Sequence, residues 1–162
     1  LTESGAIVTI TDINEDRVHQ VGAKYGAKIF TGADLYSADV DIYAPCALGA
    51  TINDATINNI KASIIAGAAN NQLANEAVHG KILKEKGILY APDFLINAGG
   101  VINVYSELVK WTNAQVMEKT ENIYNTALEI FKFADDNNIT THQAAFSMAQ
   151  KRIDDAKNEL KK

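Results

Sequence analysis

Three short apolar runs in the middle of the chain each lead directly into a cluster of small and amide residues. The runs, each with the cluster that follows it, are 40–43 with 44–50, 63–65 with 66–72, and 87–90 with 91–100. Helices predicted at 53–60, capped by Asn53, and at 76–86 separate the runs. This alternation predicts a parallel sheet. Because open α/β sheets bind ligands at the carboxyl ends of their strands, the clusters predict one ligand-binding edge.

Two further strands are predicted near the start of the chain. Residues 6–11 are rich in β-branched side chains and predict a buried strand, and Lys28-Ile29-Phe30 predicts a second one. Between them, Asn14 is expected to cap an amphipathic helix that ends at Gly26. The strand and helix alternation therefore begins well before the first cluster.

The last third of the chain carries only helical signals. Helical spacing continues over 101–110, Asn113 is expected to cap a longer helix, and Thr141 is expected to open the last one. The predicted fold class is α/β, a Rossmann-like doubly wound parallel sheet followed by a C-terminal helical lobe. The predicted boundaries are 1–100 for the alternation, 101–162 for the helices and 1–162 for a single partial domain.

Composition excludes several classes of protein. The chain has 162 residues, enough for one hydrophobic core, and its net charge of -5 argues against nucleic-acid binding. No apolar run approaches the ~20 residues of a membrane span, so no membrane association and a cytoplasmic location are expected. The single cysteine cannot form an internal disulfide. No Cys and His cluster has metal-ligand spacing, so no metal site is predicted.

Asp12 stands at the carboxyl end of the first predicted strand. A dinucleotide-binding unit has a glycine-rich turn after its first strand, and an acid about 20 residues farther on accepts hydrogen bonds from the ribose. Asp12 suits that acid, yet only eleven residues precede it, and the ten glycines form no Gly-x-Gly. We therefore expect the first strand and the glycine-rich turn to be missing here and to lie upstream in the natural protein. In the strand order 3-2-1-4-5-6 the first strand lies at the centre of the sheet. Without it, the strands at Ile7 and Val40 each lack the neighbour that the first strand would provide.

Three segments together resemble one enzyme family. The segments are 44–50, 69–73 and 92–103. In this order they closely resemble the amino-acid dehydrogenases that act on glutamate, leucine, phenylalanine and valine, with leucine dehydrogenases as the nearest match, and the resemblance covers essentially the whole chain. It implies the NAD-binding domain of an oxidoreductase that reversibly deaminates an L-amino acid to its 2-oxo acid and ammonia.

The resemblance also implies roles for individual residues. Asp12 would hold the adenosine ribose, and its charge would repel a 2′-phosphate, which favours NAD over NADP. The other implied cofactor contacts lie near the nicotinamide end and are Cys46, Ala47, Leu48, Asn70 and Asn97. Asn71 would help to hold the substrate carboxylate, while Val101 and Val104 would line the side-chain pocket. Two β-branched apolar residues suit a branched-chain substrate better than a charged one.

The sequence departs from the family in one large respect. Family members carry their catalytic lysines and a catalytic aspartate in an N-terminal domain, and no lysine of this sequence stands in the matching context. No catalytic residue is therefore assigned, and the chain alone is predicted to be inactive. The partners that the resemblance implies are a branched-chain L-amino acid or its 2-oxo acid, an N-terminal catalytic domain, and further copies of the chain in a homo-oligomer.

These residues also allow simpler structural interpretations, and two functions other than a dehydrogenase are considered. Asp12 could cap the following helix, Asn70-Asn71 could form a turn, and Val101 and Val104 could belong to a helix core. A methyltransferase-like domain is an alternative function, because an acid after the second strand also suits the ribose of S-adenosylmethionine. A non-enzymatic assembly module is another. The asparagine pair and the segment 97–100 favour the dehydrogenase, since they match its motifs.

Overall fold

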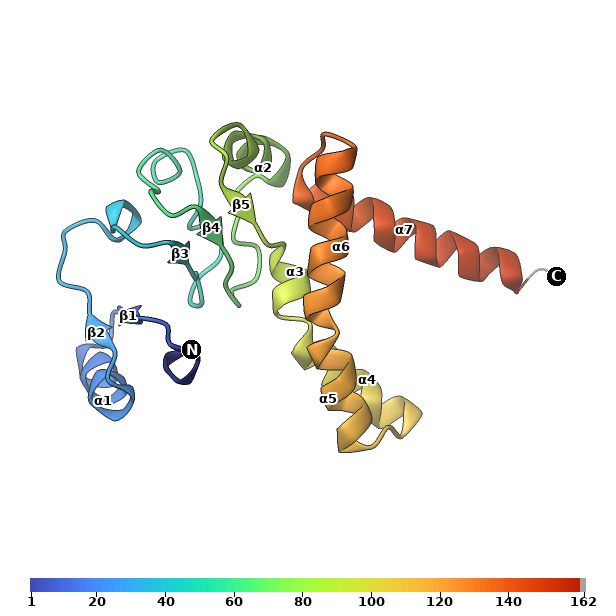
Figure 1. The fold of residues 1–162 in the computed structure, drawn as a ribbon, viewed down its shortest axis with the longest axis horizontal. Coiled ribbons are helices and arrows are strands. Elements are labelled where there is room, and N and C mark those ends of the chain that lie inside the picture. Colours follow the sequence, from blue (N-terminus) through green and yellow to red (C-terminus); the bar gives the residue numbers. More distant parts are fainter. Residues whose placement is uncertain (161–162) are drawn as a thin grey trace. The chain divides into compact units, whose positions relative to one another are not determined.

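The computed structural model describes residues 1–160. Helices or turns separate its short parallel strands, and only helices follow the last strand (Figure 1). The chain divides into two compact units, Leu1–Ala38 and Asp39–Lys162, which are described separately below. The predicted α/β class with parallel strands is confirmed. The single-domain boundary at 1–162 stays a prediction, and residues 161–162 of the predicted helical lobe lie outside the described part.

The first unit contains one pair of strands and one helix. Its elements are a 3-10 helix at Thr2–Ser4, β1 (Thr9–Ile10), α1 (Glu15–Tyr25), β2 (Lys28–Ile29) and a second 3-10 helix at Leu35–Ser37. β1 pairs in parallel with β2. Asn14 caps α1 by accepting a hydrogen bond from the Arg17 N–H at 2.9 Å, and Gly26 ends the helix with a φ of 66°. Both ends of α1 were predicted correctly.

The prediction of a buried strand over residues 6–11 is wrong in two respects. β1 has only two residues, and the side chain of Ile7 is 82% exposed. The physical reason lies in the pairing, because β1 is an edge strand of a two-stranded sheet. The residues that precede it therefore have little sheet surface on which to pack.

The second unit contains a three-stranded parallel sheet. Its strands, in spatial order, are β3 (Ile42–Tyr43), β4 (Ile64–Ile65) and β5 (Leu89–Tyr90). Ile64 of the central strand lies opposite Ile42 on one side and Leu89 on the other. An isolated parallel bridge joins Ile52 to Leu73, and both side chains are buried. Because all three strands run in the same direction, their carboxyl ends lie at one edge.

The segments between the strands of this sheet differ from each other. The helix predicted over 76–86 is α2 (Glu76–Glu85), which packs against β5 and buries Leu83 completely. The predicted helix over 53–60 is absent from this described segment, which forms consecutive turns. There the Asn53 side chain accepts from the Ala55 N–H, and the Asn53 N–H donates to the Thr56 hydroxyl. These side-chain bonds compete with helical backbone bonds, which explains the wrong prediction.

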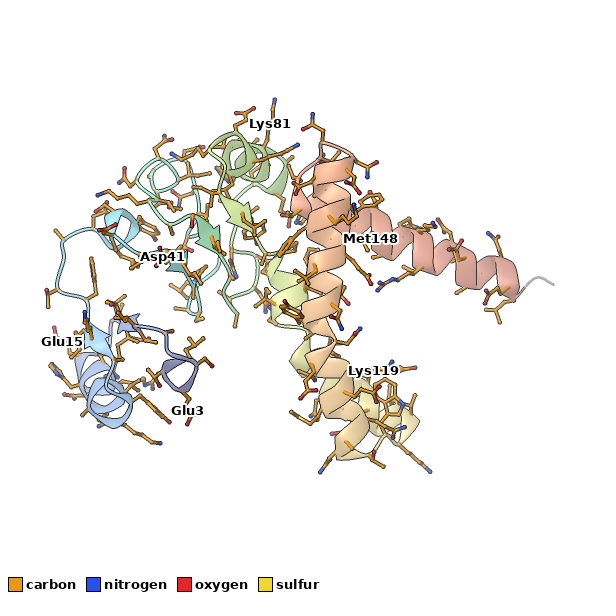
Figure 2. The ribbon with its side chains drawn as sticks, in the orientation of Figure 1. Glu3, Glu15, Asp41, Lys81, Lys119 and Met148 are labelled. Atoms are coloured by element: carbon orange, nitrogen blue, oxygen red, sulfur yellow. The ribbon has the colours of Figure 1, made fainter. Side chains whose placement is uncertain are left out.

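Five helices complete the second unit. They are α3 (Asp93–Ile96), α4 (Gly99–Val109), α5 (Asn113–Glu121), α6 (Ile123–Asp136) and α7 (Thr141–Glu159). α6 and α7 pack on each other around Ile130, Ala134, Ala144 and Ala145, and Met148 lies beside this contact (Figure 2). None of the helices within residues 1–160 is long and apolar enough to cross a membrane.

The predicted helix caps in this lobe need small corrections. The single helix expected after Asn113 is two helices that meet at Asn122. Thr112, and not Asn113, caps α5. The last helix, α7, begins at Thr141 as predicted, and Thr140 caps it. In both cases the threonine and a glutamine three residues later form a capping box. The side chain of each residue accepts a hydrogen bond from the backbone N–H of the other.

Candidate functional site

The loops that follow β3 and β4 touch through their backbones. A Cβ atom placed on Gly67, after β4, would lie 2.2 Å from the carbonyl oxygen of Pro45, after β3. A Cβ on Gly49 would lie 2.7 Å from the carbonyl oxygen of Asn70. The Ala69 N–H also donates to the Pro45 carbonyl at 3.0 Å. Only glycine permits these approaches, so the two loops form one continuous surface at the edge of the sheet.

The asparagines predicted at this edge meet in the structure. The Asn97 side-chain amide donates to the Asn70 side-chain oxygen, and it lies 3.4 Å from the Ala68 carbonyl oxygen. Asn97 follows α3, so this contact joins the loop after β4 to the region after β5. An asparagine amide has two donor hydrogens and an acceptor oxygen. The Asn70 side chain is exposed, so the pair retains hydrogen-bonding capacity for a ligand.

Buried polar side chains hold the loop that carries the asparagine pair. Gln72 is completely buried, and its Nε2 donates to the carbonyls of Gly67 at 2.7 Å and Ala69 at 3.0 Å. The Asn71 N–H donates to a carboxylate oxygen of Asp93. Asn71 itself has a φ of 52°, in the left-handed region that asparagine tolerates better than most residues. The loop is thus fixed from inside while the Asn71 residue remains exposed.

Asp93 and Tyr90 form a buried pair below this loop. Asp93 is the first residue of α3 and only 8% exposed, and its Oδ1 accepts from the Tyr90 hydroxyl at 3.3 Å. Burial, followed by the nearby Asp93 carboxylate, raises the pKa of Tyr90 well above its ordinary value. The phenol therefore stays protonated and serves as the donor. The Thr141 hydroxyl donates to the Tyr90 carbonyl at 2.6 Å, which ties the start of α7 to β5.

The sequence interpretation missed Gln72, Tyr90 and Asp93 as residues of this region. Asp93 and Tyr90 have an ordinary explanation in the sequence. An acid at the start of a helix favours the helix dipole, and a tyrosine inside a strand is typical. The available signal was that Gln72 and Asp93 lie inside the motif segments 69–73 and 92–103. Burial, which shows the importance of these side chains, arises only when distant segments pack.

The remaining predicted site residues are exposed. Cys46, Ala47 and Leu48 lie on the loop after β3, and Leu48 is 74% exposed. Val101 and Val104 lie one turn apart on α4, with 66% and 63% exposure. They are therefore not part of a helix core in the described residues.

Asp12 belongs to the first unit, separately from the other predicted residues. It is exposed, and its Oδ1 accepts from the Asn14 N–H at 2.9 Å, immediately before α1. This contact is close to what the helix-capping interpretation of Asp12 predicts, but it uses only one of the two carboxylate oxygens. The other oxygen retains acceptor capacity, so the local geometry also permits a bond to a ribose hydroxyl.

Comparison with known proteins identifies similar chains. The profile of the family described as Glutamate/Leucine/Phenylalanine/Valine dehydrogenase matches residues 4–160. The L-tryptophan dehydrogenase of Nostoc punctiforme is 44% identical over 162 residues, which are 100% of this chain and 46% of that protein. The leucine dehydrogenase of Geobacillus stearothermophilus is 48% identical over 154 residues, which are 95% of this chain and 42% of that protein. The chain thus spans less than half the length of these relatives.

A solved structure shares the fold. The crystal structure of L-tryptophan dehydrogenase from Nostoc punctiforme superposes with a TM-score of 0.88 and 45% identity. The match covers 93% of this chain and 45% of that chain. This likeness agrees with the Rossmann-like class predicted from the alternation of strands and helices.

Proposed function

Since this chain belongs to the glutamate/leucine/phenylalanine/valine dehydrogenase family, we propose that it is the NAD-binding part of an amino-acid dehydrogenase. The proposed reaction is the reversible oxidative deamination of an L-amino acid to its 2-oxo acid and ammonia. One observation carries the proposal. The loops after β3 and β4 meet through glycines, and the amides of Asn70 and Asn97 join there. No comparison supports the methyltransferase-like or the non-enzymatic alternative.

The residues of this edge fit the nicotinamide end of the cofactor. The nicotinamide ring is flat and carries a carboxamide, whose donors and acceptor match the amides of Asn70 and Asn97. The exposed loop 46–48 offers small and apolar side chains to the ring. Asp12 holds the adenosine ribose in this proposal and disfavours a 2′-phosphate, which selects NAD. When bound, the cofactor accepts a hydride from the amino acid.

The proposed substrate is a branched-chain L-amino acid such as leucine. Asn71 helps to hold its carboxylate, and the exposed valines of α4, Val101 and Val104, line the pocket for its side chain. Apolar β-branched residues disfavour a charged side chain, because a charge would lose its hydration without a partner. Relatives of similar identity are named for leucine and for tryptophan, so activity assays need to compare both amino acids.

The chain supplies binding residues and no catalytic base in this proposal. The catalytic lysines that the family resemblance implies would come from a catalytic domain, such as the part of the relatives that this chain does not span. Assembly into a homo-oligomer is also proposed from the resemblance. The protein's own residues then bind and orient the cofactor and the substrate at the edge of the sheet.

Cys46 provides a direct test of cofactor binding that needs no catalysis. It is the sole cysteine of the sequence and it is exposed, so a thiol reagent reports on the loop after β3. We expect saturating NAD to slow the modification of Cys46 severalfold, because the bound nicotinamide end covers the loop. NADP at the same concentration should protect less.

A matched control places the thiol elsewhere. In a Cys46→Ser, Ser147→Cys double variant, the thiol lies on the exposed surface of α7, and NAD should not change its rate of modification. Equal protection at both positions would indicate a general effect of NAD on the reagent. No protection of Cys46 at NAD concentrations that saturate calorimetric binding would refute the proposed location, and no calorimetric binding at all would refute NAD binding.

A further inference from the structure

We propose that Asp93 is a positioning residue, which fixes the backbone of Asn71 and thereby sets where the Asn71 side chain meets the substrate. The inference rests on the proposed function, in which Asn71 helps to hold the substrate carboxylate. Asp93 does not touch the substrate in this proposal. Its effect passes through the hydrogen bond from the Asn71 N–H to its carboxylate.

The first observation is that Asp93 is a buried carboxylate held by hydrogen bonds from uncharged groups. It is 8% exposed, and its two oxygens accept from the Asn71 N–H and the Tyr90 hydroxyl. The ion pairs found within residues 1–160 do not include it. A buried carboxylate is unfavourable unless such bonds compensate for the lost hydration. The carboxylate and the Asn71 N–H therefore hold each other in place, since neither the burial nor the hydrogen bond allows Asp93 to turn away.

The second observation is that both backbone groups of Asn71 are held. Its N–H donates to Asp93, and its carbonyl accepts from the Ala50 N–H at 2.7 Å. Its φ of 52° lies in the left-handed region, which is unfavourable for a residue with a side chain. Once these two bonds fix the backbone, only side-chain torsions remain for Asn71 to adopt. Such preorganisation favours binding, because little conformational freedom is lost when the ligand arrives.

The third observation is that Asp93 is itself anchored from the far side. The raised pKa of Tyr90 keeps its phenol protonated, so the hydroxyl donates to Asp93 and does not repel it. The Thr141 hydroxyl in turn holds the Tyr90 carbonyl. A chain of hydrogen bonds therefore runs from the start of α7 through β5 to the backbone of Asn71. This chain gives Asp93 a fixed position from which to orient the loop.

The test is the Asp93→Asn variant of the full-length protein, which keeps the size of the side chain and removes its charge. We expect the KM for leucine to rise roughly fivefold to tenfold, because a hydrogen bond to a neutral group is weaker than one to a carboxylate. The dissociation constant of NAD, whose proposed contacts are other residues, should stay unchanged. In nuclear magnetic resonance spectra, the amide proton of Asn71 should move upfield.

Asp54→Asn serves as the matched control. It is the same substitution in the same unit, at a carboxylate that is 93% exposed and contacts His79. Neither the KM nor the Asn71 amide signal should change in this variant. Tyr90→Phe is the second variant, in case Asp93→Asn does not fold. It removes one anchor of Asp93, so a smaller increase in KM is expected, and an unchanged KM would overturn the proposal.

The outcomes separate this inference from the proposed function. An Asn71 amide that does not move in Asp93→Asn, or a KM and an NAD dissociation constant that rise by the same factor, would overturn the positioning role while the dehydrogenase assignment stands. Full-length wild-type protein that binds NAD but turns over neither leucine nor tryptophan would overturn the proposed function, and the substrate role of Asn71 with it, even if the amide signal moves.

Discussion

Tyr90 shows how a single buried group makes stability depend on pH. Its side chain is 3% exposed, and its pKa is raised above the ordinary value of 10.0 by burial and then by the Asp93 carboxylate. Above pH 10 the unfolded chain loses this proton while the folded chain keeps it. The contribution to stability is therefore complete below about pH 10 and falls as the pH rises toward the raised pKa.

Comparison with Tyr90→Phe isolates this effect. Between about pH 9 and pH 11, the free energy of unfolding of the wild-type protein should fall more steeply than that of the variant, because the variant lacks the group. Urea unfolding at several pH values measures both slopes. Parallel slopes would show that the Tyr90 phenol titrates alike in the folded and the unfolded chain.

Gly67 is the residue with the least room for a side chain. A Cβ atom there would lie 2.2 Å from the Pro45 carbonyl oxygen, which is backbone and cannot move aside cheaply. We expect Gly67→Ala to lower the free energy of unfolding by about 1–3 kcal/mol through overpacking. Gly80→Ala is the control, since a Cβ atom at Gly80 would lie 3.8 Å from the nearest side-chain atom, on Leu73. That change should be neutral or stabilise α2 by up to about 1 kcal/mol.

The sequence predicted some site residues and missed others for a physical reason. Motif resemblance identified Asn70 and Asn97 as parts of one edge, and the structure joins their side chains. It could not identify Asp93 or Gln72, because their importance depends on burial by segments far away in the chain. The roles of all these residues toward a ligand stay predictions.

At the scale of elements, the start of α7 depends on a capping box. The Gln143 N–H donates to the Thr140 hydroxyl at 3.2 Å, and the Thr140 N–H donates to the Gln143 side chain at 3.1 Å. Thr140→Ala should destabilise the protein by about 1 kcal/mol in urea unfolding. The same substitution at Thr126, whose hydroxyl donates to the Asn122 carbonyl within α6, should have almost no effect. An equal loss of unfolding free energy in the two variants would show that the capping box of α7 does not stabilise the protein beyond an ordinary threonine within a helix.

Helices were predicted better than strands at this scale. α1 has both of its predicted ends, because Asn14 and Gly26 mark them by local chemistry. Each strand has only two residues, fewer than the apolar runs suggested. Pairing requires a partner at each position, and the apolar run does not specify where the partner ends. The turns over 53–59 were mistaken for a helix, because asparagine and threonine side chains there bond to nearby backbone.

At the scale of the whole molecule, catalysis is expected to need residues other than those of this chain. The chain spans 42% of the leucine dehydrogenase from Geobacillus stearothermophilus, and the proposed site contains no lysine. We therefore expect the purified 162-residue chain to produce no NADH from leucine in an absorbance assay. The full-length leucine dehydrogenase from Geobacillus stearothermophilus, assayed under the same conditions, is the positive control. Leucine-dependent NADH formation by the chain alone would contradict this prediction.

The glycine contacts between the loops divide the cofactor edge into fixed and variable positions for protein engineering. Gly49 and Gly67 lie against backbone atoms, so a library that varies them would mostly yield damaged folds. The side chains of 46–48 are exposed and have no such backbone contact, and Leu48 is 74% exposed. Diversity aimed at a different cofactor therefore belongs at these three positions, where new chemistry can be tried with little loss of stability.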